Sequence, residues 1–256
     1  MLDDWPALPL LVRPALPLLV RASSRAADED HINAIIAVLK CSDRVRHICF
    51  NYLRNSLCEK IWATMQVSFP DLTMVSLGSN GKTAPLIPDS FLGLSAPRLL
   101  YMQLEGIPFP GLPKLLSSAA RLVELHLQDI PHSGYISPQA MVTCLSTLTR
   151  LEKLYLEFRS SRSHPDREIR SVPPPKHSVL PALMYFRFKG ASEYLEDLVT
   201  CIDIPKLKDL YIIFFNQIDF DNPQLAKFIQ RTPTFKAPDE ARVQFHDSTA
   251  SIALPS

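Results

Sequence analysis

The sequence predicts an α/β fold in which short parallel strands alternate with helices. A strand-like unit, with apolar residues at its first, fourth and sixth positions, recurs seven times along the chain. Segments with helical periodicity lie between these units, and strands that are joined through helices pair in parallel. The seven units are VRHICF from Val45, LTMVSL from Leu72, LLYMQL from Leu99, LVELHL from Leu122, LEKLYL from Leu151, LMYFRF from Leu183 and LKDLYI from Leu207.

The spacing of these units indicates the kind of repeat. Their starting positions differ by 27, 27, 23, 29, 32 and 24 residues, in or near the window of about 20–29 residues that is typical of leucine-rich repeats. In such repeats the three apolar positions point inward and stack on those of the next repeat. We therefore expect a leucine-rich-repeat solenoid over residues 28–246, with parallel strands on its concave face and helices on its convex face.

The turns that follow the strand units are expected to be irregular. A regular repeat carries Asn or Cys at its ninth position, where the side chain satisfies backbone groups of the turn. In this chain only Asn80 fills that position, whereas the other units have residues such as Leu53 and Arg159 there. The sequence thus predicts irregular repeats.

Three connecting segments carry one apolar stripe with helical spacing. Start signals accompany further helices: Ser56 with Glu59 predicts a capping box, and Ser137 and Asn222 each precede a proline, which predicts an N-cap. The stripes are Ile32, Ile35, Ile36 and Leu39; Leu112, Leu115, Leu116 and Ala119; and Leu195, Leu198, Val199 and Ile202.

Three segments lie outside the repeat pattern. Residues 1–27 are rich in proline and contain the octapeptide PALPLLVR twice, at Pro6–Arg13 and Pro14–Arg21. We expect this segment to be disordered or loosely packed, with one copy as a candidate edge strand. The polar stretch 159–178 is expected to be an inserted flexible loop; its five basic and two acidic residues leave a docking loop for an acidic partner as the alternative. Residues 247–256 are expected to form a C-terminal tail.

Charge and composition exclude several classes of protein. The 27 basic and 26 acidic residues give a net charge of +1, so no overall field attracts nucleic acid. No apolar run reaches the ~18 residues of a membrane span. Acidic residues and prolines near the N-terminus argue against a signal peptide. Five widely spaced cysteines without a C-x-x-C pair indicate a reducing compartment, the cytoplasm or the nucleus.

The sequence carries no strong catalytic or metal-binding signal. The string GSNGKT at Gly78–Thr83 ends like a phosphate-binding loop, but Ser76 stands where that loop needs glycine and Pro85 opposes the following helix. The seven histidines form no H-x-x-x-H pair and have no local cysteine partner, which argues against a zinc site. We therefore expect a non-catalytic protein without metal or cofactor. A triad built from distant residues stays open as an alternative.

Strand alternation places the third, fifth and seventh positions of each unit on the concave face. Tyrosine and arginine recur there, and these residue types dominate protein interface energies. We expect a monomer that binds a protein substrate through this face; the alternative is that these are ordinary solvated strand residues. The candidate binding residues are Tyr101, Gln103, Glu124, His126, Lys153, Tyr155, Tyr185, Arg187, Asp209 and Tyr211.

Several long segments resemble the leucine-rich-repeat region of the large fungal families of F-box domain-containing proteins. The resemblance runs from about Asp28 to about His246 and is carried by SFPDLTMVSL, DSFLGLSAPRLLYMQLEGIPFPGLPKLLSSAARLVELHL, IPHSGYISPQAMVTCLSTLTRLEKLYLEF and YLEDLVTCIDIPKLKDLYIIFFNQIDFDNPQLAKFIQRTPTFKAPDEARVQF. It implies that the repeats hold the substrate of an SCF-type ubiquitin ligase.

The F-box itself is missing from the resemblance. Neither an L-P-x-E-[LI] opening nor a helical triplet stands before Asp28, so binding of the ligase adaptor is not implied. The chain is then either a truncated copy or a protein that works through its repeats alone. A truncated or structural repeat remnant without a dedicated partner is the alternative function.

Overall fold

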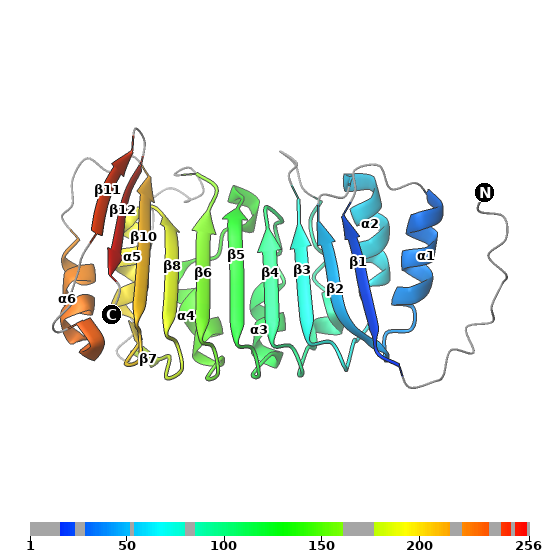
Figure 1. The fold of residues 1–256 in the computed structure, drawn as a ribbon, viewed down its shortest axis with the longest axis horizontal. Coiled ribbons are helices and arrows are strands. Elements are labelled where there is room, and N and C mark those ends of the chain that lie inside the picture. The colour runs from blue at the N-terminus through cyan, green and yellow to red at the C-terminus, as the bar shows by residue number, and fades with distance from the viewer. Residues whose placement is uncertain are drawn as a thin grey trace.

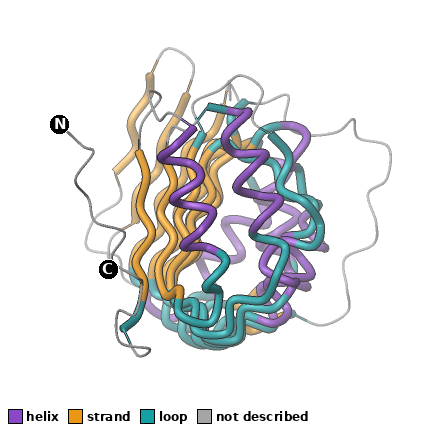
Figure 2. The backbone as a smooth tube through the Cα atoms, turned by 90° about the vertical axis from the view of Figure 1, so that its right-hand side faces the viewer, coloured by secondary structure: helices purple, strands orange, loops and turns teal. Residues whose placement is uncertain are grey.

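The chain folds into a single sheet that is covered by helices on one face. The computed structural model describes residues 16–23, 29–51, 54–79, 85–160, 177–215, 222–235, 242–246 and 249–254. Within these residues the main sheet has ten strands in the order β1-β2-β3-β4-β5-β6-β8-β10-β12-β11. The first eight pair in parallel and alternate with helices. Figure 1 shows the strands in front of the helices, and Figure 2 shows both layers from the end of the sheet. The predicted α/β class with a parallel sheet is confirmed.

All seven repeated units form strands, as predicted. Equivalent positions of successive units are paired in register; Met102 of one unit, for example, faces Val75 and Leu125 of its two neighbours. The strands are β2 (Val45–Asn51), β3 (Met74–Gly78), β4 (Tyr101–Glu105), β5 (Glu124–Ile130), β6 (Lys153–Phe158), β8 (Tyr185–Gly190) and β10 (Asp209–Phe215).

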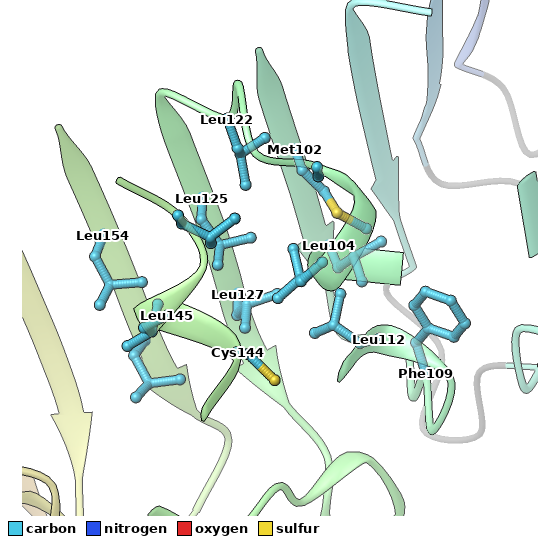
Figure 3. Close-up of a cluster of buried hydrophobic side chains, with 14 of the residues drawn as sticks. Met102, Leu104, Phe109, Leu112, Leu122, Leu125, Leu127, Cys144, Leu145 and Leu154 are labelled. Carbon is cyan, nitrogen blue, oxygen red and sulfur yellow. The ribbon is translucent and has the colours of Figure 1, made fainter. Parts of the chain in front are cut away.

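The inward-facing apolar positions of these units form the core between the sheet and the helices. None of the first, fourth and sixth residues of the seven units is more than 4% exposed. Figure 3 shows part of this core, where Leu125, Leu127 and Leu154 from the strands lie against Leu112 and Leu145 from the helices. Burial of each such side chain contributes roughly 1.5–3 kcal/mol, so the fold is stabilised collectively by stacked repeats.

Helices connect most of the parallel strands. The apolar stripes that the sequence predicts lie on α1, α3 and α5, except that Ala119 is the C-cap of α3 and Ile202 belongs to the short strand β9. A 3₁₀ turn, η1 (Phe91–Leu94), takes the place of a helix between β3 and β4. The helices are α1 (Glu29–Leu39), α2 (Asn55–Thr64), α3 (Leu112–Ser118), α4 (Pro138–Ser146), α5 (Ser192–Thr200) and α6 (Pro223–Arg231); the short elements are η2 (His132–Gly134), η4 (Pro233–Phe235), β7 (Ser178–Val179) and β9 (Ile202–Asp203).

The N-termini of α4 and α6 are capped by side chains in two different ways. Ser137 caps α4 as predicted, because its hydroxyl accepts a bond from the backbone N–H of Ala140 at 3.3 Å. Asn222 occupies the N-cap position of α6 without a side-chain bond; Glu196 of α5 instead accepts the N–H groups of the first turn of α6 at 2.9 and 2.8 Å. The predicted capping box at Ser56 is wrong, since α2 already begins at Asn55.

Both ends of the sheet extend beyond the expected repeat domain. The second octapeptide copy supplies the edge strand β1 (Leu18–Ser23), which pairs in parallel with β2, so residues 18–23 are not disordered. Val20 of β1 is buried because its side chain belongs to the core between the sheet and the helices. The expected tail 247–256 contains β12 (Thr249–Leu254), which pairs antiparallel with β10 and with β11 (Arg242–His246). The antiparallel strands β11 and β12 lie outside the repeated pattern of apolar residues, so the spacing of the repeats does not predict them.

The turns after the strands are held mainly by backbone bonds. At the carboxyl ends of three strands, the N–H groups of Ser79, Gly106 and Arg159 donate to carbonyls of the neighbouring strand at 2.9–3.0 Å. Gly106 has φ 68°, and a Cβ there would lie 2.5 Å from the carbonyl oxygen of Ser79, so glycine is required. Arg159 also pairs with Asp129 at 2.9 Å. Asn80 and residues 161–176 of the expected loop lie outside the described residues.

The alternation along β6 leads to a matched stability test. Leu154→Ala should lower the free energy of unfolding by about 2–5 kcal/mol, because Leu154 is 0% exposed and its truncation leaves a cavity in the core. The adjacent Lys153→Ala should lower the free energy of unfolding far less, since Lys153 makes an exposed ion pair. Urea denaturation followed by circular dichroism measures both. Equal losses of unfolding free energy in the two variants would contradict the assignment of Leu154 to the core and of Lys153 to the solvent-exposed side of β6.

Candidate protein-binding face

Figure 2 shows helices on one face of the sheet; the opposite face is here called the open face. The ten candidate binding residues all lie on it, because they alternate along their strands with the buried core positions. Because the strands pair in register, these residues form two rows across five strands, which span about 20 Å at the usual strand spacing. The first row is Tyr101, Glu124, Lys153, Tyr185 and Asp209, and the second row is Gln103, His126, Tyr155, Arg187 and Tyr211. All ten are partly or fully exposed. The structure therefore brings the whole predicted set together on one surface.

Aromatic rings contact one another across the open face. The ring of His126 stacks on Tyr155 with a centroid distance of 4.0 Å and an interplanar angle of 16°. Tyr101 lies 5.1 Å from His126 on one side, and Tyr185 lies 5.0 Å from Tyr155 on the other. These four residues are called the aromatic ladder below. Each ring restricts its neighbours, so the ladder presents a preformed surface.

An arginine extends this surface beyond the aromatic ladder. The guanidinium of Arg187 lies 4.8 Å from the ring centroid of Tyr211, a cation–π arrangement. Its Nε is 2.7 Å from Oε1 of Glu157, although neither atom has the alignment of a hydrogen bond. We read this contact as an ion pair, because its distance is short and the Glu157 side chain is only 12% exposed. Arg187 is thus held in place from two sides.

Amide and carboxylate groups connect neighbouring strands of the open face. The Gln103 side chain accepts bonds from the hydroxyls of Tyr101 at 2.8 Å and Ser76 at 3.3 Å, and its amide donates to Gln128 at 3.2 Å. Glu124 accepts from Lys153 at 2.9 Å. Two acid–base pairs on this face, Lys153 with Glu124 and Arg187 with Glu157, therefore neutralise each other within the free protein.

The ionisation of His126 and Glu124 is coupled. Burial lowers the pKa of His126, and the hydrogen bond that His126 makes to Glu124 only partly offsets this effect. Burial would raise the pKa of Glu124, but bonds from Lys153 and His126 outweigh it and lower the pKa. Neutral His126 can donate its Nε2–H to Glu124 at 3.3 Å and stack on tyrosine without a net charge. The ladder is therefore formed by neutral rings near pH 7.

Three open-face residues outside the predicted set also shape the surface. Glu157 and Gln128 are seventh-position residues that contact Arg187 and Gln103, so the same strand alternation could have identified them. The third is Phe215, whose ring lies 5.6 Å from the Lys189 ammonium. Phe215 stands at the ninth position, where no rule of the repeat places a side chain on this face.

A small hollow lies near the carboxyl ends of β4, β5 and β6. Apolar side chains such as Phe109, Leu127 and Phe158 form most of its lining. The hydroxyl of Tyr194 donates to the carbonyl of Ile136 at 3.0 Å, and burial raises its pKa well above the ordinary value. The lining therefore offers apolar contact and no paired nucleophile and base.

Over the described ranges, no group of three or more His, Cys, Asp or Glu residues could hold a metal ion. None of the helices in that part of the chain is long and apolar enough to span a membrane. Most of the GSNGKT string, residues 80–83, lies outside these ranges.

Comparison of the sequence with protein-family models and with curated proteins finds no match. The functional interpretation therefore depends on the parallel α/β fold and on the geometry of the open face.

The coupled pair leads to a prediction for acid titration. His126 should titrate below its ordinary pKa of 6.5, so the folded state loses stability as the pH falls from about 6.5 toward the folded-state pKa, where the unfolded chain binds the proton more strongly. Glu124→Gln should lower the His126 pKa further, because it removes the favourable charge. Two-dimensional NMR of the imidazole protons measures both values. A His126 pKa above 6.5 in the native protein would refute the buried neutral assignment.

Proposed function

We propose that this chain is a leucine-rich-repeat solenoid that recognises another protein through its open face, which would be the concave face of the solenoid. The observation that carries this proposal is the aromatic ladder with Arg187 and Tyr211 beside it, partly exposed and continuous over five strands. Tyrosine and arginine supply large contact areas with polar ends, which makes them the usual anchors of protein interfaces.

The contacts within the open face favour tight recognition. A side chain that is ordered only on binding costs ~0.5–1.5 kcal/mol in conformational freedom. Stacking of His126 on Tyr155 and the ion pair of Arg187 reduce this cost, since both side chains are already restrained. Because Lys153 and Arg187 are each paired with a glutamate, complementarity of shape and hydrogen bonds would contribute to the selection of the partner together with the charge.

The proposed context is substrate recognition for an SCF-type ubiquitin ligase, without catalysis and without a cofactor. The sequence resemblance to the repeat region of fungal F-box proteins supports this context. The chain would act as a monomer in the cytoplasm or nucleus, and its partner would be a protein rather than nucleic acid or a membrane. Association with the ligase adaptor is not part of the proposal, because the resemblance does not extend to an F-box.

A double substitution tests the open face directly. Tyr155→Ala with Arg187→Ala should weaken partner binding by at least ~30-fold, the effect of losing one strong interface anchor or more. The tagged chain and the variant would be purified from native cells, and bound proteins compared by quantitative mass spectrometry, with affinity then measured by calorimetry. Thermal melting would verify that the variant is folded.

Lys114→Ala is the matched control, because this residue is exposed and lies off the open face. Undiminished binding by the open-face variant would refute the proposed surface. Recovery of an adaptor and a cullin with the wild-type chain would support the ligase context. Failure to enrich any protein would favour the repeat remnant without a partner.

A further inference from the structure

A β-turn of the same form precedes six of the seven repeated strands, at the amino end of the sheet. In each turn the N–H of the fourth residue donates to the carbonyl of the first at 2.9–3.4 Å. Both of these residues are at most 2% exposed, whereas the two residues between them are partly or fully exposed. The core therefore fixes the backbone of each turn, and the third turn residue always lies at the same edge of the sheet. The turns, at the lower ends of the strands in Figure 1, are 69–72, 96–99, 119–122, 148–151, 180–183 and 204–207.

Basic residues occupy the third position of four of these six turns, whereas Asp71 and Ala182 occupy it in the other two. The four basic residues, here called the basic row, are Arg98, Arg121, Arg150 and Lys206. The strands that they precede, β4, β5, β6 and β10, follow one another in the sheet with only β8 between the last two. The basic row therefore extends over about 19 Å at the usual strand spacing.

The contact between Arg98 and Asp71 shows how a carboxylate fits this row. Nη1 of Arg98 lies 2.5 Å from Oδ1 of Asp71, which is the third residue of the neighbouring turn. Arg121, Arg150 and Lys206 make no ion pair within the residues that the structure describes. Three cations of the row are therefore available to the acidic groups of another molecule.

Nearby side chains do not cancel the charge of the basic row. The second position of each of the six turns is proline, alanine or threonine. Glu152 and Lys208 each follow a residue of the row by two positions and have opposite charges. Asp203, which precedes the last turn, is already paired with Arg231 at 2.8 Å. The edge of the sheet therefore keeps a positive local charge.

The surroundings of the row favour an acidic peptide over nucleic acid. None of the exposed positions in the six turns is aromatic, so these turns offer no ring on which a base could stack. Leu100, two residues after Arg98, is 37% exposed and offers apolar contact to the side chains of a peptide. Pairs between guanidinium and carboxylate groups are strong and directional. A fully extended segment of about six residues would span the row at about 3.3 Å per residue.

We propose that the basic row binds an extended acidic segment of another protein, with Asp and Glu side chains paired to Arg121, Arg150 and Lys206. The carboxylates of this segment take the place beside these residues that Asp71 takes beside Arg98. The site uses none of the ten candidate residues of the open face, so it does not depend on the function proposed for that face.

Fluorescence anisotropy of a labelled peptide of glutamates tests this site on the full chain, at low ionic strength where screening is weak. Arg121→Gln with Arg150→Gln should weaken binding at least ~5-fold, because two exposed ion pairs are lost. Lys114→Gln with Lys227→Gln is the charge-matched control and should keep most of the affinity. Both lysines are exposed and lie on helices, α3 and α6, rather than in the turns of the row.

Asp71→Asn gives a result that partial unfolding could not imitate. This variant loses the carboxylate that holds Arg98, so the peptide should bind roughly 2–5-fold more tightly, the effect of one added exposed ion pair. Affinities that the arginine and Asp71 substitutions leave unchanged would overturn the proposal. Equal losses in the arginine variant and the lysine control would also overturn it, because net charge alone would then attract the peptide. Tighter binding of an oligothymidylate of equal charge would identify a nucleic-acid site instead.

Discussion

Lateral stacking of apolar side chains across in-register parallel strands is the interaction on which the rest of the structure depends. An inward residue such as Leu125 has equivalent partners one strand away on either side. The central residues of the seven repeat strands keep this alignment from one strand to the next. A shift of one strand by one residue would turn its apolar set toward solvent. Register and burial therefore specify each other, and the positions of the outward side chains follow from both.

Most of the strand layer could be predicted from the sequence, because its signal is local and repeated. The apolar positions of seven units specify the strands, their direction and the face on which residues such as Tyr155 lie. The closing strands could not be predicted in this way. β12 pairs antiparallel through the backbone, and β1 belongs to a proline-rich duplication whose composition favours disorder. In both cases the segment forms a strand because it pairs with the free edge of a neighbouring strand, and this pairing is a tertiary interaction that local sequence does not encode.

The candidate site also has a part that the sequence predicts and a part that depends on tertiary contacts. Strand alternation predicts which residues share the open face, but their contacts depend on side-chain geometry that no spacing rule contains. The stacking of His126 on Tyr155 and the restraint of Arg187 by Glu157 are of this kind. Capping shows a similar difference: Ser137 acts locally and is predictable, whereas Glu196 satisfies the start of another helix 28 residues away.

The in-register strands also place side chains at regular intervals across the open face. Equivalent side chains such as His126, Tyr155 and Arg187 follow one another at the strand spacing of about 4.8 Å, whereas an extended peptide advances about 3.3 Å per residue. The two periods coincide at about 10 Å, which corresponds to two strands and three peptide residues. A linear ligand lying across the strands would thus be contacted in phase at every third residue, and variation within one repeat would alter one subsite without disturbing the others.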